Sequence, residues 1–264
     1  YFNNLMNKPD IVQSNADFVK TLEILKTQKT FSELDYRITR AEIIQALGNA
    51  KNCKSAGPDS IIYELIKHGQ SALIMPMEVV FNKVFSTGTF PDTWSVSLIK
   101  PLYKGTGPIN DPSKYRGISL MSCMGKLLCA IMNNRLVTHL ESRGDLNKVQ
   151  IAFRKKYRTT DHTLVLQTII HKYIHKFKPV GNENRYLYTA FIDFSKAYDT
   201  VWREALFYKL ISSGINGPFL NVIESIYKNY KIQIKLEDGL TETIKTNLGV
   251  KQGCILSPTL FNFY

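Results

Sequence analysis

The sequence predicts an α+β fold that is rich in helices and holds a small antiparallel sheet. In most segments before residue 186, apolar residues recur at helical spacing. Strand-type alternation is concentrated after that point, and residues 231–250 alternate on both sides of Asp238-Gly239, a pair typical of hairpin turns. We therefore expect the sheet to consist of this hairpin and of a β-prone strand that ends just before Asp193.

The first elements are predicted to be helices. Thr39 and Glu42 have the spacing of a capping box, so a helix is expected over about residues 41–50. A turn follows, and then a second helix that Gly69 closes. A third helix is expected to start near Pro76, because proline suits the first helical turn.

The later elements follow from the same patterns. Residues 95–105 form a strand-like run that Pro101 is expected to break. Helical spacing returns over residues 125–144 and 161–177, and a further helix is expected within 217–230. Helices therefore separate the strand-like run from the hairpin.

Composition and charge favour a polyanionic partner. The 264 residues carry a formal net charge of +12, which indicates nucleic acid first and an anionic membrane surface second. A charge that serves only solubility is the alternative. No apolar run has the roughly 18 residues of a membrane span, and no signal peptide is evident. The four cysteines form no CxxC pair, so an intracellular protein of the nucleus or cytoplasm is expected. The chain starts at Tyr1 and stops inside an apolar run, which suggests a segment of a longer polypeptide.

Two aspartates stand out in "FIDFSKAYDT", residues 191–200. Asp193 comes where the expected strand ends, so it either caps a helix or holds a metal ion. Asp199 precedes a helix-like run at 201–210, and its simpler interpretation is the N-cap of that helix.

Two other patterns indicate weaker sites. His171 and His175 stand four residues apart on one helical face, but lysines surround them and no third ligand is evident, which favours a solvated face over zinc. The run "RKKYR" at 154–158 interleaves an aromatic with basic residues. This favours contact with nucleic-acid phosphates, while a plain solvated face or a targeting signal stays open. Its basic members are Arg154, Lys155, Lys156 and Arg158.

Five blocks in one order resemble a known family. They are residues 54–67, 97–136, 150–166, 190–201 and 249–262, and the strongest are "FIDFSKAYD" and, about sixty residues later, "QGCILSPTLF". Together they resemble the fingers and palm of the reverse transcriptase of a non-LTR retrotransposon, similar to the jockey group. The resemblance covers about residues 38–264. It implies an N-terminal flank (1–37), fingers with adjoining palm helices (38–185) and an incomplete palm (186–264).

The resemblance implies a metal-dependent nucleotidyl transfer. Asp193 matches the first catalytic, metal-binding aspartate, and the carbonyl of Phe194 would add a metal oxygen. The chemistry agrees, because nucleotide addition uses two Mg²⁺ ions about 4 Å apart and carboxylates suit Mg²⁺. The second aspartate pair and the thumb are expected beyond the last residue, so the isolated chain is expected to be inactive.

The resemblance also implies a site for the incoming deoxynucleotide. Tyr198 matches the aromatic gate that excludes a 2′-hydroxyl, although a core aromatic is the alternative. Lys196 and Ala197 would offer backbone N–H groups to the triphosphate. The remaining matches are Lys104 (or Lys100 in its place), Arg116, Gln252 and Gly253.

Two departures and two alternatives stay open. The chain has Gly117 where the family usually has proline, which would loosen a finger turn, and Ala152 where it usually has glycine.

The expected partners are an RNA template, a DNA primer and dNTPs. A group II intron or retron reverse transcriptase is the alternative enzyme, and a catalytically dead remnant that only binds nucleic acid is the alternative outside catalysis.

Overall fold

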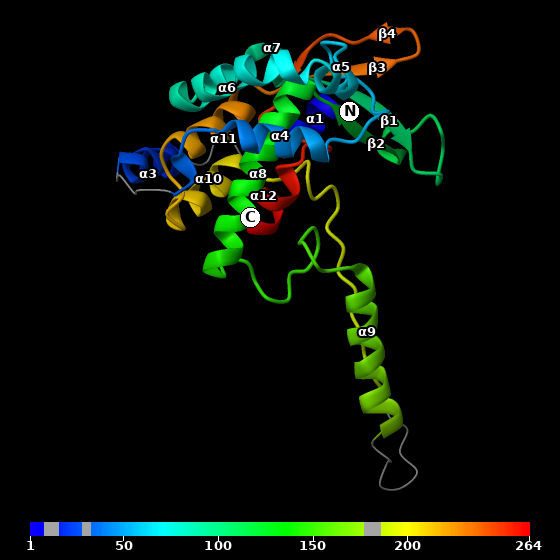
Figure 1. The fold of residues 1–264 in the computed structure, drawn as a ribbon. Helices are drawn as coiled ribbons and strands as arrows, with labels where there is room; N and C mark the ends of the chain where they lie inside the picture. The colour runs from blue at the N-terminus through cyan, green and yellow to red at the C-terminus, as the bar shows by residue number, and fades with distance from the viewer. Residues whose placement is uncertain (8–15, 28–32, 177–185) are drawn as a thin grey trace, which may run out of the picture. The chain divides into compact units, whose positions relative to one another are not determined.

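The computed structural model describes residues 1–7, 16–27, 33–176 and 186–264 (Figure 1). These residues form two compact units. Tyr1–Asp145 and Ala197–Tyr264 make up the first unit, and Leu146–Lys196 make up the second. Within the described ranges, no helix is long and apolar enough to cross a membrane.

The first unit holds a mixed sheet. Its strands are β1 (Val96–Tyr103), β2 (Tyr115–Leu120), β3 (Lys231–Leu236), β4 (Gly239–Leu240) and β5 (Ile244–Lys245). They lie in the order β2-β1-β3-β4, and β5 also pairs with β3. β1 runs antiparallel to β2 but parallel to β3, so the prediction of a purely antiparallel sheet is wrong. Parallel pairing needs a long crossover, which the helices between β1 and β3 provide.

The predicted hairpin is confirmed, with its turn one residue earlier than expected. Leu236 lies opposite Gly239, so Glu237 and Asp238 form the loop. After β4, regular strand pairing stops, but Thr241 still bonds to β3. Its N–H donates to the carbonyl of Ile234 (3.1 Å), and its hydroxyl accepts from the N–H of Ile234 (3.0 Å).

Pro101 does not break β1, contrary to the prediction. It lies opposite Gly117 of β2, whereas the pairing of β1 with β3 ends at Ile99. Pro101 therefore lies where β1 has a single neighbouring strand, which is where a sheet tolerates proline. Gly117 lies inside a strand and not in a turn, so the expected loosening of a finger turn is also wrong.

The strand expected before Asp193 does not form in the described residues. Residues 186–194 pair with no strand, and Tyr188 and Phe191 are 89% and 83% exposed. A strand is stable when a neighbour satisfies its backbone groups, and the described part of the second unit contains no other strand.

Helices make up most of the first unit. They are α1 (Phe2–Met6), α3 (Ala16–Thr27), α4 (Arg40–Asn49), α5 (Tyr63–His68), α6 (Gln70–Thr87), α7 (Asp92–Ser95), α8 (Cys123–Arg143), α10 (Arg203–Ser212), α11 (Pro218–Lys228) and α12 (Ser257–Phe263), with the 3-10 turns η1 (Glu33–Asp35) and η2 (Pro112–Lys114). α8 contacts α4, α7, α12 and η1 (Figure 1). Adjacent residues such as Leu127 and Leu128 are both buried on it, as expected for a helix surrounded by protein.

Three predicted helix ends can be compared with the structure. The capping box of Thr39 and Glu42 is present at α4. α5 ends before Gly69 as predicted. The start of the third helix is wrong, because α6 begins at Gln70 and contains Pro76. Burial of Ile74 before the proline and of Met77 after it stabilises the helix on both sides.

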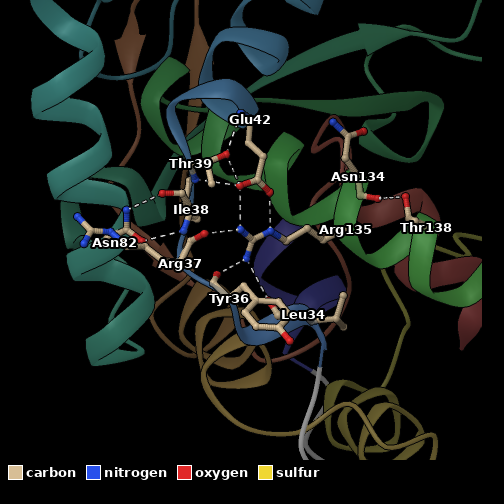
Figure 2. A network of polar contacts seen from close by, with 10 residues as sticks. All are labelled: Leu34, Tyr36, Arg37, Ile38, Thr39, Glu42, Asn82, Asn134, Arg135 and Thr138. Carbon is tan, nitrogen blue, oxygen red and sulfur yellow. Dashed lines mark hydrogen bonds and ion pairs between the residues drawn. The ribbon is translucent and has the colours of Figure 1, made fainter.

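Arg135 of α8 ties the segment before α4 to the core (Figure 2). Its Nε donates to Oε1 of Glu42 (2.6 Å), and its Nη2 donates to Oε2 (2.9 Å). Its Nη1 and Nη2 also donate to the carbonyls of Leu34 (3.0 Å), Tyr36 (2.6 Å) and Arg37 (3.1 Å). One guanidinium thus joins η1, α4 and α8.

The N-terminal residues pack onto the first unit as well. Met6 and Leu22 are buried, and the carbonyl of Met6 accepts from the N–H of Leu248 (3.0 Å). Lys26 of α3 pairs with Glu224 of α11 (2.6 Å). The division into flank, fingers and palm stays a prediction.

The second unit contains α9 (Thr159–Ile170) and a π-helical turn, His171–Lys176. They cover the helix predicted over 161–177, but α9 has no buried residue among those described. Ala152 is exposed and has no positive φ, so its backbone does not require the glycine that the family usually has there.

Candidate nucleotide-binding site

The loop after β5 joins two distant parts of the first unit. The N–H of Gly249 donates to the carbonyl of Val201 (2.9 Å), and the N–H of Val250 donates to that of Tyr198 (2.8 Å). Further along, the carbonyl of Gln252 accepts from the N–H of Ser119 in β2 (2.9 Å). The loop 246–254 therefore connects residues 198–201 to the strand that carries Arg116.

Gly253 is required by this close approach. Its φ is +112°, and a Cβ there would lie 2.9 Å from the carbonyl oxygen of Ser119. Any other residue would push the loop away from β2. The glycine thus serves the protein's own backbone, and its contact with a nucleotide stays a prediction.

Tyr198 is held by packing. Its ring stacks on Phe261 of α12, with the ring centroids 4.9 Å apart and the planes inclined by 14°. Burial raises the pKa of its hydroxyl. A gate must be rigid, so this packing is compatible with both interpretations of Tyr198.

The two cationic candidates lie on the β1–β2 hairpin. Arg116 is exposed and lies opposite Leu102 in the pair. The Nζ of Lys104 donates to the carbonyl of Ser113 (3.1 Å), so its ammonium is bonded within the hairpin. Lys100 is exposed on β1, opposite Ile118. The alternative between Lys100 and Lys104 therefore stays open.

The metal candidates belong to the second unit. Asp193 and Phe194 are exposed in its extended segment. Lys196 has a left-handed backbone (φ +54°) at the end of that unit, and Ala197 begins the second stretch of the first unit. The first unit by itself gathers Ala197, Tyr198, Gln252 and Gly253 with β2 but does not contain Asp193. Among the described residues, no cluster of three or more His, Cys, Asp or Glu side chains could hold a metal ion.

The expected cap role of Asp199 is wrong. α10 begins at Arg203, and its N-cap is Trp202, which makes no side-chain cap bond. Asp199 lies three residues before this N-cap. The segment around it makes backbone contacts instead, because the carbonyls of Tyr198 and Val201 accept hydrogen bonds from the loop 246–254.

Part of the basic cluster 154–158 makes hydrogen bonds within its own loop. Nη1 of Arg154 donates to the carbonyls of Asn147 (3.0 Å) and Gln150 (2.9 Å), and its guanidinium lies over the ring of Tyr157 (5.1 Å). Lys155, Lys156 and Arg158 are exposed.

Two buried cations, one within the loop 246–254 and one packed against it, were not predicted. Lys251 is 1% exposed, and its Nζ has no hydrogen-bond partner among the described residues. The ammonium lies 4.3 Å from the ring centroid of Tyr230, and burial lowers its pKa to about 8. The second cation is Arg203. The burial of these two side chains could not be predicted from the local sequence, because charged side chains are usually exposed.

Replacing Lys251 by methionine is expected to stabilise the protein at pH 7. Below a pKa of about 8, the folded protein holds a buried ammonium, which costs roughly 3 kcal/mol at 1.36 kcal/mol per pKa unit. As the pH rises toward the unfolded pKa of 10.5, the folded state loses its proton first, so wild-type stability gains and the advantage of the variant shrinks. Urea unfolding at pH 7 and 9.5 measures both effects.

The exposed Lys228 supplies the control. Lys228→Met should change stability little at either pH. A Lys251→Met protein that is less stable than wild type at pH 7 would show that the buried ammonium is favourable.

Comparison with known proteins identifies the class and then the family. Residues 104–264, more than half of the chain, match the polymerases described as "Reverse transcriptase (RNA-dependent DNA polymerase)". The chain therefore belongs to the reverse transcriptase family. This confirms the predicted resemblance to non-LTR retrotransposon reverse transcriptases.

Two of the similar proteins come from mobile elements of Drosophila. The chain is 25% identical over 251 residues to a probable RNA-directed DNA polymerase from transposon BS of Drosophila melanogaster, covering 95% of the chain and 27% of the relative. It is 26% identical over 229 residues to the RNA-directed DNA polymerase from mobile element jockey of Drosophila funebris, covering 86% and 24%. The chain thus spans about a quarter of the length of these relatives.

Proposed function

We propose that the chain is the fingers and part of the palm of an RNA-directed DNA polymerase that adds dNMP units to a primer 3′ hydroxyl. The observation that carries this proposal is the loop 246–254, whose Gln252 and Gly253 lie against β2 while Val250 bonds to Tyr198. These residues come from separate family motifs, and in the first unit they meet at one place.

In this proposal Mg²⁺ is the cofactor, held by Asp193 and the carbonyl of Phe194. An exposed carboxylate and a carbonyl are hard oxygen ligands, so the residues present fit the ion. One carboxylate is too few for two ions, so other ligands must come from outside these residues and the isolated chain should be inactive. Bound Mg²⁺ would activate the primer hydroxyl and neutralise phosphate charge.

The remaining candidates would act on the substrates. Arg116, with Lys104 or Lys100, would bind the triphosphate through charge-assisted hydrogen bonds. The N–H groups of Lys196 and Ala197 would bind it too. The exposed cations of the 154–158 cluster would contact the backbone of the RNA template or DNA primer.

Primer extension by the full-length protein tests the proposal. On an RNA template with dNTPs and Mg²⁺, the protein should extend a DNA primer. A full-length protein that binds the primer–template but adds no nucleotide would instead support the catalytically dead, nucleic-acid-binding alternative.

Replacing Tyr198 by alanine should change selectivity more than rate. The ring is a steric barrier, so its loss should raise ribonucleotide use relative to deoxynucleotide use by roughly tenfold or more, which requires only about 1.4 kcal/mol. Competition between rNTP and dNTP in primer extension measures the ratio. Tyr198→Phe keeps the ring and should retain selectivity. Unchanged selectivity in the alanine variant would assign Tyr198 to the core alone.

A further inference from the structure

Arg203 is a buried cation that donates hydrogen bonds to backbone carbonyls and to one side-chain hydroxyl. It is 4% exposed. Nε donates to the carbonyl of Gly249 (2.9 Å), and Nη1 donates to those of Thr246 (2.6 Å) and Tyr227 (3.1 Å). Nη2 donates to Oγ1 of Thr246 (2.9 Å) and to the carbonyl of Leu248 (2.7 Å).

The surroundings keep this guanidinium charged and fixed. The rings of Tyr227 and Tyr230 lie 5.3 Å and 5.9 Å from its central carbon. Burial lowers its pKa to about 10, so it remains protonated at neutral pH. A buried charge is tolerated when its donors are satisfied, and here the loop carbonyls, the hydroxyl of Thr246 and the carbonyl of Tyr227 accept from them.

The same loop leads directly to the nucleotide-binding candidates. Arg203 binds residues 246–249, and three residues later Gln252 and Gly253 meet Ser119 of β2. Arg203 also follows Val201, whose carbonyl accepts from Gly249 (2.9 Å). The base of the loop is therefore attached to the start of α10, and its tip is attached to β2.

We propose that Arg203 is a positioning residue that sets Gln252 and Gly253 for the incoming dNTP. It acts through the loop backbone and not by contact with substrate, and the inference rests on the proposed function. Lysine cannot replace it, because one ammonium cannot reach carbonyls on three sides as the planar fork does.

The test compares Arg203→Lys with wild type in the full-length protein. Displacement of a substrate-binding loop by about 1 Å costs up to roughly a hundredfold, so KM for dNTP should rise roughly tenfold to a hundredfold. The affinity for primer–template should stay within about twofold, because Arg203→Lys keeps the positive charge and the side chain at this position is buried. Thr246→Val removes one acceptor of Arg203, together with the bond that the Thr246 hydroxyl donates to the carbonyl of Tyr230 (3.4 Å). It should shift KM in the same direction by less, which keeps the test usable if Arg203→Lys folds poorly.

Arg135→Lys is the matched control. Arg135 also donates to several carbonyls, but they lie in residues 34–37 and not in the loop. This control should lower stability without raising KM for dNTP. If both lysine variants raise KM equally, or if neither Arg203→Lys nor Thr246→Val changes it, the positioning role is wrong.

Hydrogen exchange separates this inference from the proposed function. The N–H groups of Val250 and Ser119 bond to the carbonyls of Tyr198 and Gln252, and they should exchange faster in folded Arg203→Lys. Unchanged exchange overturns the inference whether or not the protein polymerises. Faster exchange in a full-length protein that adds no nucleotide would leave Arg203 holding the loop and would contradict only the proposed function and the effect on dNTP.

Discussion

Asp193→Asn is expected to reduce RNA-templated DNA synthesis by the full-length protein at least roughly a thousandfold. Metal ions supply several kcal/mol of charge stabilisation in such reactions, and each 1.36 kcal/mol is tenfold in rate. Asparagine keeps the size and hydrogen bonding of the side chain but removes the charge that holds Mg²⁺. Asp193 is exposed, so the melting temperature should not change. The measurement is dTTP incorporation on poly(rA) with an oligo(dT) primer.

Asp199→Asn is the matched control for this experiment. It makes the same chemical change six residues along the chain, outside the proposed metal site. The control should retain synthesis. If Asp199→Asn abolished synthesis at an unchanged melting temperature while Asp193→Asn did not, the roles of the two aspartates would be reversed.

Arg135→Met is expected to cause the largest loss of stability, roughly 2–3 kcal/mol, because breaking a fully buried ion pair costs about 3–5 kcal/mol and this pair is only partly buried. The side chain of Arg135 is 13% exposed and pairs with Glu42 at 2.6 Å. Methionine fills similar space but leaves Glu42 unpaired and the carbonyls of residues 34–37 without their donor (Figure 2). Urea unfolding measures the loss.

An exposed pair of the same length provides the control. Nε of Arg40 lies 2.6 Å from Glu78, but the side chain of Arg40 is 59% exposed. Arg40→Met should therefore cost less than about 1 kcal/mol. Equal losses in the two variants would show that burial does not set the strength of the Arg135 pair.

Short sequence motifs correctly predicted two features of local structure. The capping box at α4 spans only Thr39 to Glu42, and a hairpin forms between neighbouring strands, so both could be predicted. The prediction that Pro76 starts a helix was wrong because the burial of Ile74 and Met77 offsets the cost of the proline inside α6, and α6 packs against α4 and α11. A local rule cannot include that packing.

The pairing of distant strands in the sheet could not be predicted from the local sequence. Alternation identified β3, but nothing in the segment 231–236 indicates that β1 pairs with it in parallel. Likewise, the β-prone residues before Asp193 remain without a strand partner among the described residues. Propensity describes one strand, whereas a sheet depends on the neighbour that satisfies its backbone.

By itself, the sequence determined the family, the order of its motifs and the candidate residues, because these depend on residue identity and spacing. The contacts of the loop 246–254 with both Tyr198 and β2, and the burial of Arg203 against the loop and of Lys251 within it, became evident only from the tertiary structure. The physical reason is that burial of a charge depends on the carbonyls and rings that surround it. Those of Arg203 come from Tyr227 of α11, from Tyr230 and from the loop 246–254, all more than twenty residues away along the chain.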